Sequence, residues 1–195
     1  ALGLQGMIND LVQRSDSPTP ALPKGEGVEQ QLKNKDVNTI ARLISIAENR
    51  PEEFYQLFVT PPSGAGGAPV LGITGTGGAG KSSLVDELVL RFLIDFPTKT
   101  IGIISVDPSK RKTGGALLGD RIRMNAINHP NIYMRSMATR ENNLAVSPYI
   151  GQAINILKAS GTDLVILETS GIGQSDTQIV GLSDVTLYVM TPEFG

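Results

Sequence analysis

The residues that decide the fold are Gly75-Thr76-Gly77-Gly78-Ala79-Gly80-Lys81-Ser82, which match the pattern G-x-x-x-x-G-K-[ST] at every fixed position. They follow an apolar run at 70–74 and precede a segment with apolar residues at helical spacing that stops at Pro97. We therefore predict a strand, a glycine-rich loop and a helix over residues 82–96. In that order, backbone N–H groups of the loop and the helix N-terminus can surround a chain of phosphates.

The side chains of this loop have distinct expected roles. Lys81 can reach the outer phosphates of a nucleotide, and the hydroxyl of Ser82 can bind Mg²⁺. A glycine-rich turn that arose by chance is the alternative, and the readable strand and helix on either side count against it. The other predicted nucleotide-binding residues are Gly75, Thr76, Gly77, Gly78, Ala79, Gly80 and Ser83.

The composition is that of a folded protein without overall basic character. Of 195 residues, 40% are hydrophobic and 18% are charged, and the formal net charge is -2. This balance provides no general attraction to nucleic acid. The absence of cysteine excludes disulfides and cysteine metal sites, and no apolar run approaches the roughly 20 residues that span a bilayer. We expect a cytoplasmic protein with neither a nucleic-acid nor a membrane partner.

Beyond the loop, apolar strands alternate with helical segments. Strands are predicted at 100–106, 131–136, 164–167 and 185–190, and a helix is predicted at 148–159. Near-continuous apolar strands separated by helices indicate an α/β fold, with a mainly parallel sheet, helices on both faces and a phosphate-loop NTPase architecture. Ligands bind such sheets beyond the carboxyl ends of the strands, where Gly75, Asp107 and Glu168 all fall.

The N-terminal part of the chain is predicted to consist of helices and a proline-rich linker. Residues 1–14 have apolar side chains at helical spacing, but one short amphipathic helix has too little surface to fold alone. Residues 15–35 begin with a Pro/Ser-rich stretch and are predicted to be a linker. Residues 36–62 are predicted to form a helical extension of two helices, and residues 68–195 the phosphate-loop domain.

Acidic residues directly follow two of the predicted strands. Asp107 alone is typical of a turn, and Glu168 could simply end its strand. Beside a phosphate loop, however, Glu168 stands where such proteins place a carboxylate that holds Mg²⁺ directly or through water. Gly171 could bring its N–H to the terminal phosphate, because glycine permits close backbone approach. Gln174 could orient the attacking water.

Several motifs carry a resemblance to a known family. In chain order they are Gly75 to Ser82, Val106-Asp107-Pro108-Ser109, Gly114 to Arg121 with Arg123-Met124, and Glu168 to Ser175. Over residues 36–195 the chain resembles the MeaB/ArgK family, the GTPases that chaperone adenosylcobalamin-dependent acyl-CoA mutases. The resemblance implies Mg²⁺-dependent hydrolysis of GTP to GDP and phosphate, with Lys81, Glu168 and Gln174 as catalytic residues.

The same resemblance implies further roles around the nucleotide. Ser82, Asp107, Asp120 and Glu168 would form the Mg²⁺ neighbourhood. Asp120 lies in what resembles the first switch of the family, a loop expected to order when the terminal phosphate is present. The candidates for sensing the nucleotide state are Arg121, Arg123 and Arg140, each of which could instead pair with surface carboxylates. In the family, the nucleotide cycle gates adenosylcobalamin loading and protection of the mutase.

Two segments resemble the fused isobutyryl-CoA mutases, in which a cobalamin-binding domain, a GTPase domain and a mutase substrate domain share one polypeptide. Residues 1–14 look like the closing helix of the cobalamin-binding domain, and residues 137–143 look like the longer stretch of the fused form. The resemblance implies that the partners are the other two domains, and that adenosylcobalamin binds outside this segment. It also implies a homodimeric full-length protein that isomerises isobutyryl-CoA to n-butyryl-CoA elsewhere in the polypeptide.

The choice of base stays open at this point. The guanine-reading N-K-x-D motif of the family is absent from these residues, and we expect it to follow Gly195 in a longer chain. The alternatives are an ATP-dependent phosphate-loop enzyme and a non-catalytic nucleotide-binding switch. A metal-delivery GTPase for nickel enzymes is a further alternative, against which the absence of cysteine and the single histidine count.

Overall fold

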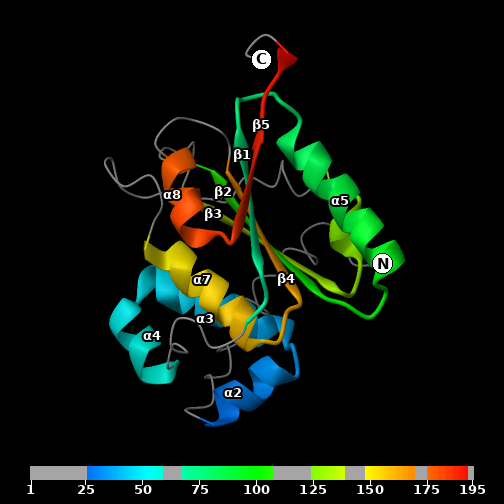
Figure 1. Cartoon of the computed structure of the whole chain (residues 1–195). Helices are drawn as coiled ribbons and strands as arrows, with labels where there is room; N and C mark the ends of the chain where they lie inside the picture. The colour runs from blue at the N-terminus through cyan, green and yellow to red at the C-terminus, as the bar shows by residue number, and fades with distance from the viewer. Residues whose placement is uncertain (1–25, 59–66, 108–123, 139–147, 170–174, 193–195) are drawn as a thin grey trace, which may run out of the picture.

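Five parallel strands form one sheet in the computed structural model (Figure 1). The structure describes residues 26–58, 67–107, 124–138, 148–169 and 175–192. The strands within these residues are β1 (Val70–Gly75), β2 (Ile101–Asp107), β3 (Ile132–Ala138), β4 (Leu164–Thr169) and β5 (Val185–Val189). All neighbouring strands pair in parallel, which confirms the predicted α/β sheet.

The strand order places the ends of β1 and β4 side by side. The order is β3-β2-β4-β1-β5, so β4 is inserted between β1 and β2 although it follows both in the chain. Ile73 of β1 is in register with Glu168 of β4, and Ser105 of β2 is in register with the same glutamate. The carboxyl end of β4 therefore lies next to the loop that leaves β1, at the edge where ligands bind open parallel sheets.

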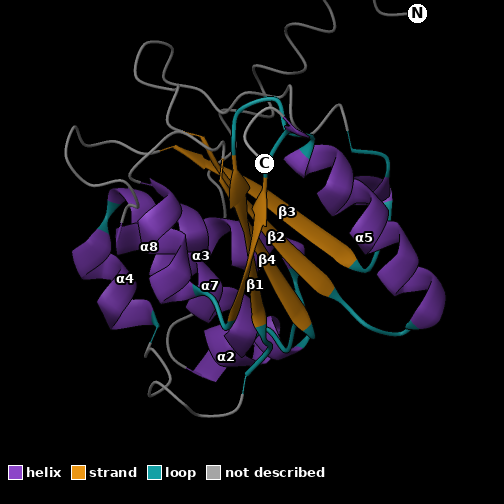
Figure 2. Ribbon diagram, turned by 45° about the horizontal axis from the view of Figure 1, so that its top comes forward, coloured by secondary structure: helices purple, strands orange, loops and turns teal. Residues whose placement is uncertain are grey.

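Helices cover both faces of the sheet (Figure 2). On one face lies α5 (Lys81–Asp95), which contacts the short 3-10 helix η2 (Ala126–Asn128). The helices on the other face are α2 (Glu26–Lys33), α3 (Val37–Asn49), α4 (Pro51–Leu57), α7 (Pro148–Ala159) and α8 (Ser175–Leu182). The two helices expected within residues 36–62, the helix after the loop and the helix at 148–159 are thus all observed.

Two hydrophobic clusters fill the spaces between these layers. Residues of the strands alternate between the clusters, because successive side chains of a strand point to opposite faces. Ile103 and Ile166 belong to the cluster beneath α5, whereas Ile104 and Leu167 belong to the cluster beneath α3 and α7. Both faces of the central strands are therefore buried. The alternation also directs Glu168, which follows Leu167, to the α5 face.

The prediction of a linker over residues 15–35 is wrong for residues 26–33, because these residues form α2. Val28 and Leu32 are 0% and 1% exposed and belong to the larger cluster. This helix was not predicted because it is short and mostly polar, and such a helix depends on tertiary packing. Helix α8 was not predicted either. The helix predicted at 1–14 lies outside the described residues and stays a prediction.

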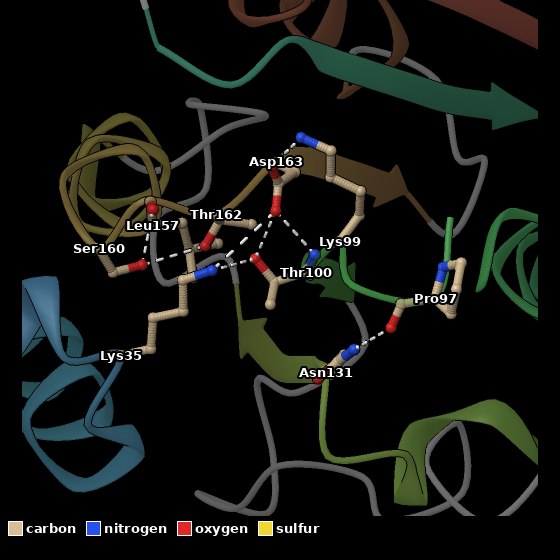
Figure 3. Close-up of polar contacts among 9 residues, drawn as sticks. All are labelled: Lys35, Pro97, Lys99, Thr100, Asn131, Leu157, Ser160, Thr162 and Asp163. Carbon is tan, nitrogen blue, oxygen red and sulfur yellow. Dashed lines mark hydrogen bonds and ion pairs between the residues drawn. The ribbon is translucent and has the colours of Figure 1, made fainter. Parts of the chain in front are cut away.

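Asp163 joins several segments at the amino ends of the strands (Figure 3). Its Oδ1 accepts a hydrogen bond from Lys99 Nζ at 2.8 Å, and its Oδ2 accepts from the backbone N–H and hydroxyl of Thr100 at 2.8 and 3.0 Å. Lys35, from the turn between α2 and α3, donates to the hydroxyl of Thr100 at 2.9 Å. Burial raises the pKa of Asp163, but the bonds from Lys99 and Thr100 outweigh it and lower the pKa to about 2.

We expect Asp163→Asn to lower the free energy of unfolding at pH 7 by about 2 kcal/mol, because the folded-state pKa lies below the ordinary value. The contribution of Asp163 is present above the ordinary pKa of 3.8 and is lost as the pH falls through about 2. Urea unfolding at several pH values would measure it. Asp95→Asn, at an exposed carboxylate of α5, is the control. Equal stability of the two variants would contradict this role of Asp163.

Candidate nucleotide-binding site

Gly75 and Gly80 of the phosphate loop are each required to be glycine, for different reasons. Gly75 has φ +138°, and a Cβ atom there would lie 1.7 Å from the carbonyl oxygen of Val189 on β5. Gly80 has φ 85° and is the N-cap of α5. A side chain would be strained at either position. The first glycine permits close packing against β5, and the second permits the turn into the helix.

Lys81 is the first residue of α5, and its side chain folds back onto the loop. Its Nζ donates to the carbonyl oxygens of Gly75 at 3.1 Å and Thr76 at 2.8 Å. The residue is only 6% exposed. These bonds hold a positive charge at the loop, where anionic phosphates would have to bind.

Thr76 adds an observation that fits a phosphate ligand. Its Oγ1 atom is buried, and no hydrogen-bond partner for it exists within the part of the chain that the structure describes. Buried polar atoms are otherwise hydrogen-bonded in folded proteins. A phosphate oxygen would accept a hydrogen bond from this hydroxyl, so the loop residues fit a nucleotide.

Ser82 and Glu168 meet at the start of α5. The hydroxyl of Ser82 donates to Oε1 of Glu168 at 2.6 Å, and Glu168 is 3% exposed. One residue comes from the first turn of α5 and the other from the end of β4. Hydroxyl and carboxylate oxygens are ligands that Mg²⁺ prefers, so this pair fits a magnesium ion beside the nucleotide phosphates.

Thr74 and Thr169 lie directly beside these candidate site residues, and neither was predicted from the sequence. Their hydroxyls are 2.8 Å apart and buried, and either can be the donor. Because strand residues alternate, this contact lies on the opposite face of the sheet from Glu168. It joins the end of β1 to the end of β4. The only sequence signal was a threonine at the end of each strand.

The other predicted site residues are placed only in part. Asp107 is the last residue of β2, in register with Ala138, and its side chain is outside the described set. Ser83 follows Ser82 on α5 and is exposed. Six predicted residues lie outside the described ranges, namely Asp120, Arg121, Arg123, Arg140, Gly171 and Gln174. Among the described residues, no group of three His, Cys, Asp or Glu side chains could hold a metal ion.

No helix within the described ranges is both long and apolar enough to cross a bilayer.

Known proteins similar to this chain include fused mutases. Fused isobutyryl-CoA mutase of Geobacillus kaustophilus is 54% identical over 100% of this chain and 18% of its own length. The protein of the same name from Cupriavidus metallidurans is 52% identical with the same coverage. The chain thus spans about a fifth of the length of these relatives.

A solved structure and a family model agree with these relatives. The crystal structure of LAO/AO transport system kinase has a TM-score of 0.66 and 23% identity, over 84% of this chain and 48% of that one, which supports the fold. The family model described as "Methylmalonyl Co-A mutase-associated GTPase MeaB" matches residues 40–195. The site geometry, the relatives and this match together show that the chain belongs to the MeaB family of mutase-associated GTPases.

Proposed function

We propose that this chain binds Mg²⁺ and GTP and hydrolyses GTP to GDP and phosphate. The observation that carries the proposal is the hydrogen bond between Ser82 and Glu168 at the start of α5, beside a phosphate loop in a MeaB-family chain. Two segments far apart in the sequence supply a hydroxyl and a carboxylate at one point. A phosphate loop with an adjacent magnesium site is the arrangement that phosphoryl transfer to water requires.

In this proposal, the site accelerates hydrolysis by positioning the phosphates and the attacking water and by neutralising the negative charge on the phosphates. Backbone N–H groups of the loop bind the phosphates, and Lys81 transfers its hydrogen bonds from Gly75 and Thr76 to phosphate oxygens. Bound Mg²⁺ would neutralise charge on the phosphates, and Ser82 and Glu168 would hold it. Gln174 is proposed to orient the attacking water.

The other predicted site residues keep supporting roles in the proposal. Gly171 would donate its N–H to the terminal phosphate, and Asp107 and Asp120 would complete the magnesium neighbourhood. Arg121, Arg123 and Arg140 are proposed to respond to the nucleotide state. Release of the terminal phosphate would then change the contacts of these residues, which is how hydrolysis becomes a conformational signal.

We propose that the conformational change on GTP hydrolysis regulates a cobalamin-dependent enzyme. The relatives that match the whole chain are named fused isobutyryl-CoA mutases, which supports a GTPase domain within such a polypeptide. In the full-length protein, a cytoplasmic homodimer in this proposal, GTP hydrolysis would gate adenosylcobalamin loading and protect the mutase. Adenosylcobalamin and isomerisation of isobutyryl-CoA to n-butyryl-CoA would belong to the cobalamin-binding and mutase substrate domains.

Phosphate release by the full-length protein tests the proposed reaction. With Mg²⁺ we expect release from GTP rather than ATP, and Lys81→Ala should reduce kcat by about 100-fold or more, because a charged contact to the transferred phosphate is lost. Lys33→Ala, at an exposed lysine of α2, is the control. ATP-selective release would contradict the proposal. Binding of GTP without turnover would indicate a non-catalytic switch instead.

Glu168→Gln tests the magnesium site separately. Glutamine can still accept the hydrogen bond from Ser82, but it lacks the charge that attracts a divalent cation. We expect the Mg²⁺ concentration for half-maximal GTP hydrolysis to rise by about tenfold or more. Magnesium titrations of the full-length variant, beside Glu87→Gln on the exposed side of α5, would measure this. An unchanged magnesium requirement would show that Glu168 does not hold the ion.

A further inference from the structure

Two serines lie in the same row of the sheet as Glu168. Glu168 of β4 is in register with Ser105 of β2, and Ser105 is in register with Ser136 of β3. All three side chains point to the α5 face, because the residue two positions earlier in each strand belongs to the cluster beneath α5. Three neighbouring strands therefore place a carboxylate and two hydroxyls in one line, at the level of the candidate magnesium site.

The preceding row of the same face is entirely apolar. It consists of Met134, Ile103 and Ile166, which are in register with one another and buried in the cluster beneath α5. A hydroxyl group buried among such side chains costs free energy unless it is hydrogen-bonded. Packing against α5 thus accounts for the apolar row but gives no reason for Ser105 and Ser136. The change from apolar to polar side chains occurs at the row that contains Glu168.

The hydroxyl of Ser136 points to a missing ligand. Its Oγ atom is buried, and it has no hydrogen-bond partner within the described ranges. Ser105, between Ser136 and Glu168, is 5% exposed. Buried hydroxyls are almost always hydrogen-bonded, and an ordered water molecule is the usual partner where the protein supplies none. The chemistry of this row therefore fits bound water.

We propose that Ser105 and Ser136 hold ordered water molecules beside Glu168 and are positioning residues for the magnesium site. The proposal rests on the proposed function of that site. Neighbouring strands lie about 4.8 Å apart, so the backbone of Ser105 is about 5 Å, and that of Ser136 about 10 Å, from the backbone of Glu168. A water molecule can span such a gap. Two hydroxyls and a carboxylate also supply the two to four hydrogen bonds that a buried water molecule makes.

The bound water would act on the metal through Glu168. One oxygen of this carboxylate accepts from Ser82, so a second contact from the serine row fixes how the carboxylate is turned. Groups that orient a metal ligand increase the affinity for the metal. Ser105 is the direct neighbour of Glu168 and should have the larger effect. Ser136 acts only through the water, so its effect should be smaller.

Magnesium titrations of the full-length protein with a non-hydrolysable GTP analogue test this role without relying on activity. We expect Ser105→Ala to raise the Kd of Mg²⁺ by about tenfold and Ser136→Ala by about threefold. The Kd of the analogue in EDTA should stay within about twofold of the wild-type value, because no metal is then bound. Ser160→Ala is the matched control, since Ser160 is a buried serine before β4 whose Oγ donates to the carbonyl oxygen of Leu157.

The double variant Ser105→Ala/Ser136→Ala tests whether the two serines share bound water. If they do, removal of Ser105 already disconnects Ser136 from Glu168, and the double variant should match Ser105→Ala, with a Kd of Mg²⁺ raised about tenfold. Independent effects would multiply to about thirtyfold, and that result would overturn the shared water. A parallel loss of nucleotide binding in EDTA would indicate a purely structural role and would also overturn the inference.

A crystal structure of the wild-type protein provides a direct readout. We expect an ordered water molecule within hydrogen-bond distance of Ser136 Oγ, whereas a protein group bonded to this atom would contradict the proposal. This readout and Ser136→Ala still decide if Ser105→Ala does not fold.

The inference and the proposed function fail in distinguishable ways. If the wild-type protein hydrolyses GTP and both serine variants match Ser160→Ala in the Kd of Mg²⁺, only the role of the serines is overturned. If the wild-type protein binds Mg²⁺ and the analogue but hydrolyses no GTP, the proposed reaction is overturned, and the titrations still decide the role of the serines. If it binds no Mg²⁺ with the nucleotide, both are overturned.

Discussion

The parallel pairing of β1 with β4 is the constraint on which the candidate site depends. It aligns Ile73 with Glu168 and brings the end of β4 to the loop that leaves β1. Contacts on both faces of the sheet hold this alignment, with Ser82 and Glu168 on the α5 face and Thr74 and Thr169 on the other. A shift of the register by one residue would turn Glu168 away from α5, because strand side chains alternate between faces.

Burial of ionisable side chains at this edge is tolerated because the fold supplies their partners. Lys81 donates to two loop carbonyls, and Glu168 accepts from Ser82. Such groups would otherwise cost free energy on burial, which is why we interpret them as parts of the candidate site rather than of the core. Asp86 shows the same principle one turn further along α5, where its partners are main-chain N–H groups of another segment. Helix α5 thus makes polar contacts with two other segments, one through Ser82 in its first turn and one through Asp86 in the next turn.

Sequence patterns predicted the elements that have strong periodicity and missed those that depend on tertiary contacts. The apolar strands, the phosphate loop and α5 were readable because their patterns are long and bounded by glycine or proline. By contrast, α2 presents only Val28 and Leu32 to the core, so its helical pattern is weak until α3 and α7 pack against it. Asp86 also had no visible signal, because an aspartate on a helix is usually a solvated residue.

The sequence by itself determined the chemistry of the loop, since glycines at fixed spacing before Lys81 and Ser82 leave few uses other than phosphate binding. It also indicated a mainly parallel sheet whose central strands are covered on both faces, because those strands are near-continuously apolar. Only the tertiary structure decided that β4 lies between β1 and β2, which brings Glu168 to within hydrogen-bond distance of Ser82. The reason is physical: strand order and the partners of buried polar groups depend on contacts between residues far apart in the chain, which local periodicity does not encode.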